Sequence, residues 1–181
     1  IKKALPNTEE QALIYLLMSS EQLDKEAYLS VLDEYVNQYP NSHEGYIRRA
    51  NLYMHGDDET KYPLASEDLK NAVDLATNKE EAKFQVAKTI YSYLVTLENK
   101  ESYVEWTYDK ALDIIREAIQ ISNQPIYIQL EGDILFAKKD YAGAFASYNK
   151  LNKSELVSSG TFYSAAKAKQ LMEGSDLNEV I

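Results

Sequence analysis

Residues 125–156 read PIYIQLEGDILFAKKDYAGAFASYNKLNKSEL, and this stretch decides the fold of the chain. Most apolar side chains of its first half, between Ile128 and Phe136, fall on one side of a helix. The polar residues 138–140 follow as a turn, and helical spacing resumes from Tyr141 to Leu151. The stretch therefore predicts a helical hairpin, which is two short antiparallel helices joined by a tight turn.

A glycine and an alanine indicate where the two helices touch. Gly132 stands in the middle of the first predicted helix, where glycine costs about 1 kcal/mol relative to alanine. The simplest reason for it is a neighbouring helix that comes too close for a side chain. Ala144 is the second small residue, and we expect it to match Gly132 across the hairpin.

This pattern resembles the tetratricopeptide repeat, a helix–turn–helix unit with a period of about 34 residues. The family places a bulky residue, a Leu-Gly pair, an aromatic, an alanine, a second aromatic and a late proline. Those places here hold Ile128, Glu131–Gly132, Leu135, Ala144, Tyr148 and Leu156. The departures are Glu131 for leucine, Leu135 for the aromatic and Leu156 for proline. The resemblance implies an all-α fold, a right-handed superhelical solenoid of antiparallel helix hairpins.

Copies of the same unit account for most of the chain. The small-residue place is taken by Ala50 in the second copy, Ala87 in the third and Ala166 in the fifth. We expect one solenoid domain with hairpins at about 8–39, 42–76, 79–122 and 125–152, and a partial repeat at 159–181. The last helix of this partial repeat stops at once, so we expect residues 1–181 to be a fragment of a longer chain.

The turn of the third hairpin is unusually long. Apolar residues keep helical spacing on either side of Asn99–Lys100, which predicts that both helices extend into a protruding hairpin. Tyr103, Trp106 and Tyr108 lie in this turn and form a possible interface, because tryptophan and tyrosine dominate binding hot spots. The alternative is that Trp106 folds back over the elongated helices, since large aromatic side chains are mostly buried.

Composition and charge exclude several classes of function. The formal net charge of −10 argues against nucleic-acid binding, which needs clustered lysine and arginine, and against docking on anionic lipid. The chain has no cysteine, so disulfides and cysteine-based metal sites are excluded. No apolar run approaches the roughly 20 residues needed to cross a bilayer. We therefore expect no membrane insertion in this segment.

Localisation stays open at this stage. The chain begins with Ile1 rather than methionine, so we expect that the native N-terminus, with any targeting segment, has been removed. The acidic, tyrosine-rich, cysteine-free composition resembles repeat proteins that bacteria export to the cell envelope. The cytoplasm is the alternative.

The inner face of the predicted solenoid is the strongest candidate site. Stacked hairpins curve, and their first helices line the inner groove. Aromatics, amides and opposite charges gather there, which suits an extended peptide or a partner helix. The predicted groove residues are Ile47, Asn51, Met54, Phe84, Lys88, Tyr91, Gln129, Asp133, Phe136, Tyr163 and Lys167. The alternative is an ordinary solvated face.

Two specific chemistries are not expected from the sequence. Some repeats of the family clamp a peptide's terminal carboxylate with Lys, Asn and Arg, but Ile47, Asn51, Gln85 and Gln129 do not reproduce that clamp. His43 and His55, which are the two histidines, have no nucleophile and orienting residue at catalytic spacing.

The turn that follows His55 also lacks the spacing of a calcium or zinc site. No glycine-rich phosphate loop and no catalytic carboxylate pair is present in the sequence. We therefore expect no enzyme activity, no metal and no cofactor.

The sequence thus favours a protein–protein interaction scaffold that binds a peptide or partner protein through its groove. One alternative is a structural spacer or self-assembly unit within a larger envelope-associated protein. Another is a carbohydrate-binding helical protein that uses the Trp106 region as a sugar platform. The residues do not identify the partner.

Overall fold

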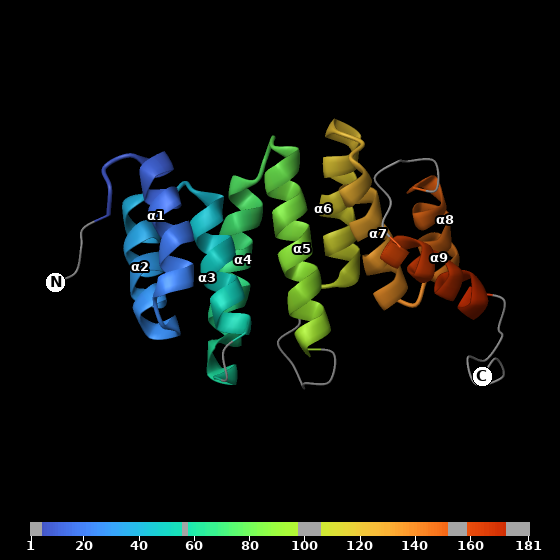
Figure 1. Cartoon of the computed structure of the whole chain (residues 1–181), viewed down its shortest axis with the longest axis horizontal. Coiled ribbons are helices and arrows are strands. Elements are labelled where there is room, and N and C mark those ends of the chain that lie inside the picture. The colour runs from blue at the N-terminus through green and yellow to red at the C-terminus, as the bar shows by residue number, and fades with distance from the viewer. Residues whose placement is uncertain (1–4, 56–57, 98–105, 152–158, 173–181) are drawn as a thin grey trace. The chain divides into compact units, whose positions relative to one another are not determined.

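The computed structural model describes residues 5–55, 58–97, 106–151 and 159–172. Within these ranges the regular structure consists of α-helices and one 3-10 turn, with no strand (Figure 1). The predicted all-α fold class is therefore confirmed. The chain forms two compact units, residues 1–77 and 78–181, and each is described by itself. A single continuous solenoid across both units stays a prediction.

The first unit consists of two helical hairpins. Its elements are α1 (Glu9–Gln22), α2 (Lys25–Gln38), α3 (His43–Met54), the 3-10 helix η1 (Glu59–Lys61) and α4 (Tyr62–Leu75). Asp24 accepts a hydrogen bond from the backbone N–H of Ala27 at 2.8 Å, so α2 begins directly after a short turn. Leu16 and Leu32 pack with Tyr35 in the core between α1 and α2.

The polar contacts of this unit centre on α3. Arg49 donates two hydrogen bonds to the buried carboxylate of Asp68 on α4, at 2.7 and 2.9 Å. Its third bond, of 2.9 Å, goes to Asp33 on α2. The hydrogen bond to Asp68 is the main reason why the pKa of Arg49 lies above its usual value. Arg49 therefore stays charged and joins three helices.

The second unit holds five helices within its described residues. They are α5 (Glu80–Leu97), α6 (Tyr108–Ile121), α7 (Pro125–Ala137), α8 (Tyr141–Leu151) and α9 (Ser159–Met172). The turn between α7 and α8 is tight: Lys139 has a φ of 67°, and Asp140 caps α8 by accepting from the N–H of Gly143 at 2.9 Å. This confirms the hairpin predicted from the opening stretch of sequence.

Gly132 makes the close contact that its place in the helix predicts. A Cβ atom at Gly132 would lie 2.5 Å from Cε1 of Tyr148 on α8. Gly45 on α3 is a second such glycine, which sequence reasoning missed: its Cβ would lie 2.7 Å from Cδ1 of Tyr35 on α2. Both tyrosines are buried and hydrogen-bonded, Tyr35 to Ser42 at 2.9 Å and Tyr148 to Asp133 at 2.6 Å.

Glu131 explains one departure from the repeat pattern. It stands where the family has leucine, is buried, and accepts from Arg116 on α6 at 2.8 Å and from Ser147 on α8 at 2.9 Å. Burial, the largest influence, raises the pKa of Glu131, but these bonds and the charge of Lys150 together bring it below the usual value. An ionised Glu131 therefore links three helices where an apolar side chain was expected.

Two expectations need correction. Ala166 is exposed, whereas Ala165 and Ala168 of α9 are buried, so the repeat period assigned the wrong alanine to the covered side of α9. The predicted extension of the second helix is absent directly before α6: α5 extends to Leu97, but α6 begins at Tyr108, and Trp106 and Thr107 are not helical. Residues 98–105 lie outside the described part of the chain.

Candidate functional site

A hollow of about 250 Å³ lies between α5 and α7 in the second unit. Its lining side chains alternate between aromatic, aliphatic and polar groups. They are Phe84, Lys88, Tyr91 and Ser92 from α5, and Ile126, Gln129, Leu130 and Asp133 from α7. Five of the predicted groove residues therefore meet at one place, and their role in binding stays a prediction.

The positions of these residues follow from helical spacing. Phe84, Lys88 and Tyr91 recur at steps of four and three, so they share one side of α5. The two helices are held together at their N-terminal ends by Tyr127, whose hydroxyl donates to Glu81 at 3.1 Å. The Tyr127 ring also packs against Phe84, with ring centroids 4.9 Å apart.

The hollow has an apolar floor and a polar rim. Phe84 and Leu130 are buried, while Lys88 is exposed with its Nζ 6.0 Å from the Phe84 ring centroid. Ile126 is 56% exposed although it lines the hollow. Sequence reasoning missed Ile126, because the projected groove face of α7 began at Gln129; its only signal is a large apolar residue in the first turn.

Asp133 is the carboxylate that lines the hollow. One of its carboxylate oxygens accepts the Tyr148 hydroxyl at 2.6 Å. Burial raises the pKa of Asp133 and outweighs the lowering effect of this bond. Burial is also the main reason why the pKa of Tyr148 lies far above its usual value, followed by the bond to Asp133. The ionised carboxylate is therefore costly where it stands.

The predicted groove residues of α9 are only partly brought together with those of α7. Lys167 lies with its Nζ 5.6 Å from the ring centroid of Phe136, which is half-buried on α7. Thr161 also donates to Gln129, with 3.3 Å between oxygens. Tyr163, by contrast, is 68% exposed and does not line the hollow. Of the two α9 residues predicted for the groove, Lys167 therefore lies beside a residue of α7, and Tyr163 is mostly exposed.

In the first unit, two predicted groove residues belong to the core. Ile47 and Met54 are buried, so the projected inner side of α3 is not a free surface at these positions. The neighbouring helices cover them, which the spacing within α3 could not reveal. Asn51 is half-buried, and its side-chain amide donates to the backbone oxygen of Ile47 at 3.0 Å.

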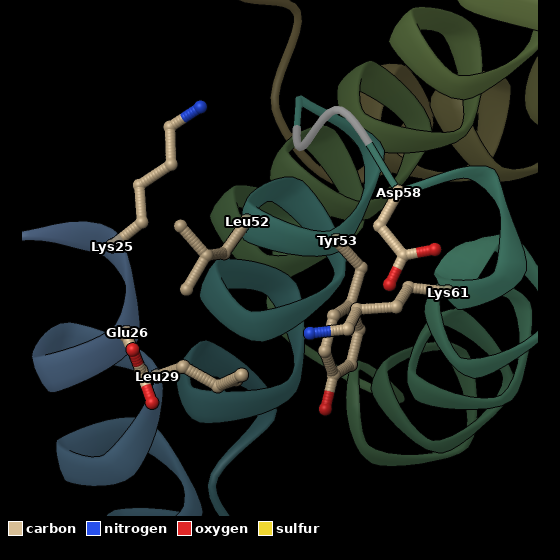
Figure 2. A pocket seen from close by; sticks show the side chains of 7 residues that line it. All are labelled: Lys25, Glu26, Leu29, Leu52, Tyr53, Asp58 and Lys61. Carbon is tan, nitrogen blue, oxygen red and sulfur yellow. The ribbon is translucent and has the colours of Figure 1, made fainter.

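A second hollow, of about 420 Å³, lies in the first unit (Figure 2). It is lined by Lys25, Glu26 and Leu29 of α2, by Leu52 and Tyr53 of α3, and by Asp58 and Lys61 near η1. Figure 2 shows leucine side chains from α2 and α3 pointing toward each other, with the charged groups around them. Sequence reasoning missed this hollow because it considered only the first helix of each hairpin.

The charged residues that line this second hollow are two lysines and two acids, and three of them contact other groups of the protein. Lys25 donates to the backbone oxygen of His55 at 3.2 Å, and Lys61 lies with Nζ 6.0 Å from the Tyr53 ring centroid. The hydrogen bond from Thr60 is the main cause of the lowered pKa of Asp58. None of these groups indicates one class of ligand.

The predicted aromatic interface of the long turn is not exposed where the structure describes it. Trp106 is only 5% exposed, and Lys110 lies with its Nζ 5.4 Å from the Trp106 ring centroid. Tyr108 is half-buried, and Tyr103 lies outside the described residues. Stacking on a sugar needs an exposed aromatic ring face, and the carbohydrate-binding alternative depended on Trp106 for it. The burial of Trp106 therefore argues against that alternative.

The remaining candidates are the two histidines, of which His43 is half-buried and His55 exposed. His43 opens α3, and His55 follows it, with Nδ1 2.9 Å from the backbone oxygen of Asn51. Across the ranges that the structure describes, no three His, Asp or Glu side chains are grouped to hold a metal ion. Nor is any helix in those ranges long and apolar enough to cross a membrane.

Comparisons with known proteins show the fold. No protein-family model and no curated protein matches the sequence. Among solved structures, the crystal structure of MamA protein is similar with a TM-score of 0.62 and 17% identity, over 88% of this chain and 79% of that chain. The structure of YrrB, described as a TPR protein with an unusual peptide-binding site, is similar with a TM-score of 0.62 and 14% identity, over 96% and 82%.

Proposed function

We propose that this chain, which has the tetratricopeptide-repeat fold, is a non-enzymatic scaffold that binds a peptide or partner protein. The proposed binding site is the hollow between α5 and α7. The observation that carries the proposal is the convergence of five separately predicted groove residues on this hollow. The likeness to a repeat protein described by its peptide-binding site supports it.

The size of the hollow favours a side chain over a small-molecule ligand. Its volume of about 250 Å³ is below the ~300–1,000 Å³ of typical small-molecule pockets. A peptide side chain can enter such a hollow while the rest of the peptide lies along the helices. The apolar floor at Phe84 and Leu130 would hold the entering side chain, and the polar rim would orient the peptide.

The same hollow carries an exposed apolar anchor, and this gives a clean test. We would select short random peptides on the full chain and measure their affinity by fluorescence anisotropy. Ile126→Gln replaces the apolar side chain by a neutral polar one at a position that is already 56% exposed, so the fold should tolerate it. We expect an affinity loss of about tenfold or more, typical of a lost interface anchor.

Ile121→Gln is the matched control. Ile121 is 52% exposed on α6 and does not line the hollow, so its substitution makes the same chemical change elsewhere. Circular dichroism of both variants checks that they are folded. Equal affinity of the selected peptides for wild type and Ile126→Gln would refute the proposed site, and so would a failure to select any peptide.

A further inference from the structure

We infer that the hollow between α5 and α7 selects peptides with a lysine or arginine side chain, which pairs with the carboxylate of Asp133. This inference rests on the proposed function and names the chemistry of the partner. It depends on a contrast between Asp133 and the other carboxylates that are desolvated in the structure.

The other two carboxylates each have an arginine partner. Asp68 receives two hydrogen bonds from Arg49, and Glu131 receives one from Arg116 at 2.8 Å. Both acids are buried and have an arginine counter-charge within the protein. This is the usual arrangement, because a desolvated charge without a counter-charge is strongly unfavourable. Burial still raises the pKa of Asp68, whereas the pKa of Glu131 is lowered.

Asp133 lacks such a partner among the described residues. Its one hydrogen bond there is the 2.6 Å bond from Tyr148, a neutral hydroxyl that the raised pKa keeps protonated. Lys88 lines the same hollow, but no ion pair between described residues joins it to Asp133. Asp133 is therefore a half-buried acid at the wall of a hollow, and no described residue supplies its counter-ion.

The surroundings of Asp133 suit an entering cation. Two aromatic residues, Phe84 and Tyr91, line the hollow together with Asp133, and aromatic faces attract ammonium and guanidinium groups. The aliphatic stem of lysine or arginine can pack on Leu130 while its charged end reaches the acid. The net charge of −10 also attracts basic peptides at long range.

Lys88, which also lines the hollow, affects which peptides can bind. It is exposed on the α5 side of the hollow, where it repels a second basic group and favours an acidic one. A ligand with one basic residue at Asp133 therefore fits better than a uniformly basic ligand. This separates a specific site from general attraction to an acidic protein.

The test uses the peptides selected from the random library. We expect wild-type protein to enrich lysine or arginine at one peptide position, and Asp133→Asn protein to lose that enrichment. The asparagine can still accept the Tyr148 hydroxyl, so the variant keeps the internal hydrogen bond. Replacing the enriched residue by norleucine or citrulline should weaken binding to wild type by about tenfold or more, with little effect on Asp133→Asn.

The norleucine and citrulline peptides keep the test decisive even if Asp133→Asn fails to fold, because they are measured on wild-type protein. Peptides that bind through Ile126 but show no basic preference would overturn this inference and leave the proposed function standing. Peptides that ignore Ile126, or no selected peptides, would overturn both. A basic preference that Asp133→Asn retains would also overturn the assignment to Asp133.

Discussion

The substitution Gly132→Ala tests the close contact between α7 and α8. A Cβ atom at Gly132 would lie 2.5, 2.7 and 2.9 Å from three ring atoms of Tyr148. The ring must retreat by about 0.9 Å to reach the 3.4 Å of an ordinary contact. Tyr148 is 1% exposed and its hydroxyl is bonded to Asp133 at 2.6 Å, so the ring has no free direction in which to move.

The expected magnitude is a balance of two effects. Alanine gains about 1 kcal/mol over glycine inside a helix. Overpacking of a filled core costs about 1–3 kcal/mol, and weakening the Tyr148–Asp133 hydrogen bond adds to this cost, since bonds to charged groups contribute about 1.5–3 kcal/mol. We therefore expect Gly132→Ala to lower the free energy of unfolding by about 2 kcal/mol, because the packing cost exceeds the helix gain.

Thermal and urea unfolding of the full chain, followed by far-ultraviolet circular dichroism, would measure this loss. For a chain of this size, about 2 kcal/mol corresponds to a Tm lowered by roughly 4–8 °C. Gly143→Ala is the matched control, since its Cβ would meet Asp140 Oδ2 at 2.6 Å, the end of an exposed side chain that can rotate away. Rotation gives up the Asp140 cap of α8, which costs about 1 kcal/mol, and the gain of about 1 kcal/mol from alanine over glycine in a helix offsets this cost. We expect the control to stay within about 0.5 kcal/mol of wild type.

The double variant Gly132→Ala/Tyr148→Leu separates the contact with the Tyr148 ring from any general loss of stability. Without the ring, the methyl group that Gly132→Ala introduces has room and the helix gain remains, so Gly132→Ala should become neutral or stabilising in that background. The reasoning is refuted if Gly132→Ala is as stable as wild type, or if it destabilises equally with and without the Tyr148 ring.

Two further predictions concern the buried charges. Arg49→Met leaves the Asp68 carboxylate buried and unpaired, so the free energy of unfolding should fall by about 3–5 kcal/mol. The control Arg48→Met should lower the free energy of unfolding by less than about 1 kcal/mol. Equal losses in the two variants would contradict the argument. The lowered pKa of Glu131 means that its stabilisation is present above its unfolded pKa and is lost as the pH falls through the folded pKa. Glu131→Gln should therefore be less stable than wild type at neutral pH and match it in acid; a constant difference across the pH range would exclude this role.

Much of the fold could be predicted because its signals are local. Helical spacing, the polar turn at 138–140 and the mid-helix Gly132 each depend on a few consecutive residues and on the sterics of close helices. The resemblance to the tetratricopeptide repeat then follows from their order. The same reasoning assigned Ala166 to the covered side of α9, where Ala165 and Ala168 are buried instead.

The candidate site could be predicted only in part. Projection along α5 and α7 selected Phe84 and Asp133, which both line the hollow, yet it omitted Ile126. It also could not show that Asp133 lacks an arginine partner among the described residues. The partners that distinguish one acid from another come from other helices: Arg116 lies 15 residues from Glu131 along the chain. No spacing rule within a single helix contains that information.

The sequence by itself determined the all-α class and the helical hairpins, because turns and apolar periodicity act over a few residues. Only the tertiary structure decided which projected positions are buried, such as Ile47, Met54 and Trp106, and which open into a hollow. The physical reason is that the exposure of a helical residue depends on the neighbouring helices that cover it. Those helices carry side chains from distant parts of the chain, and their packing sets which surface is left for a partner.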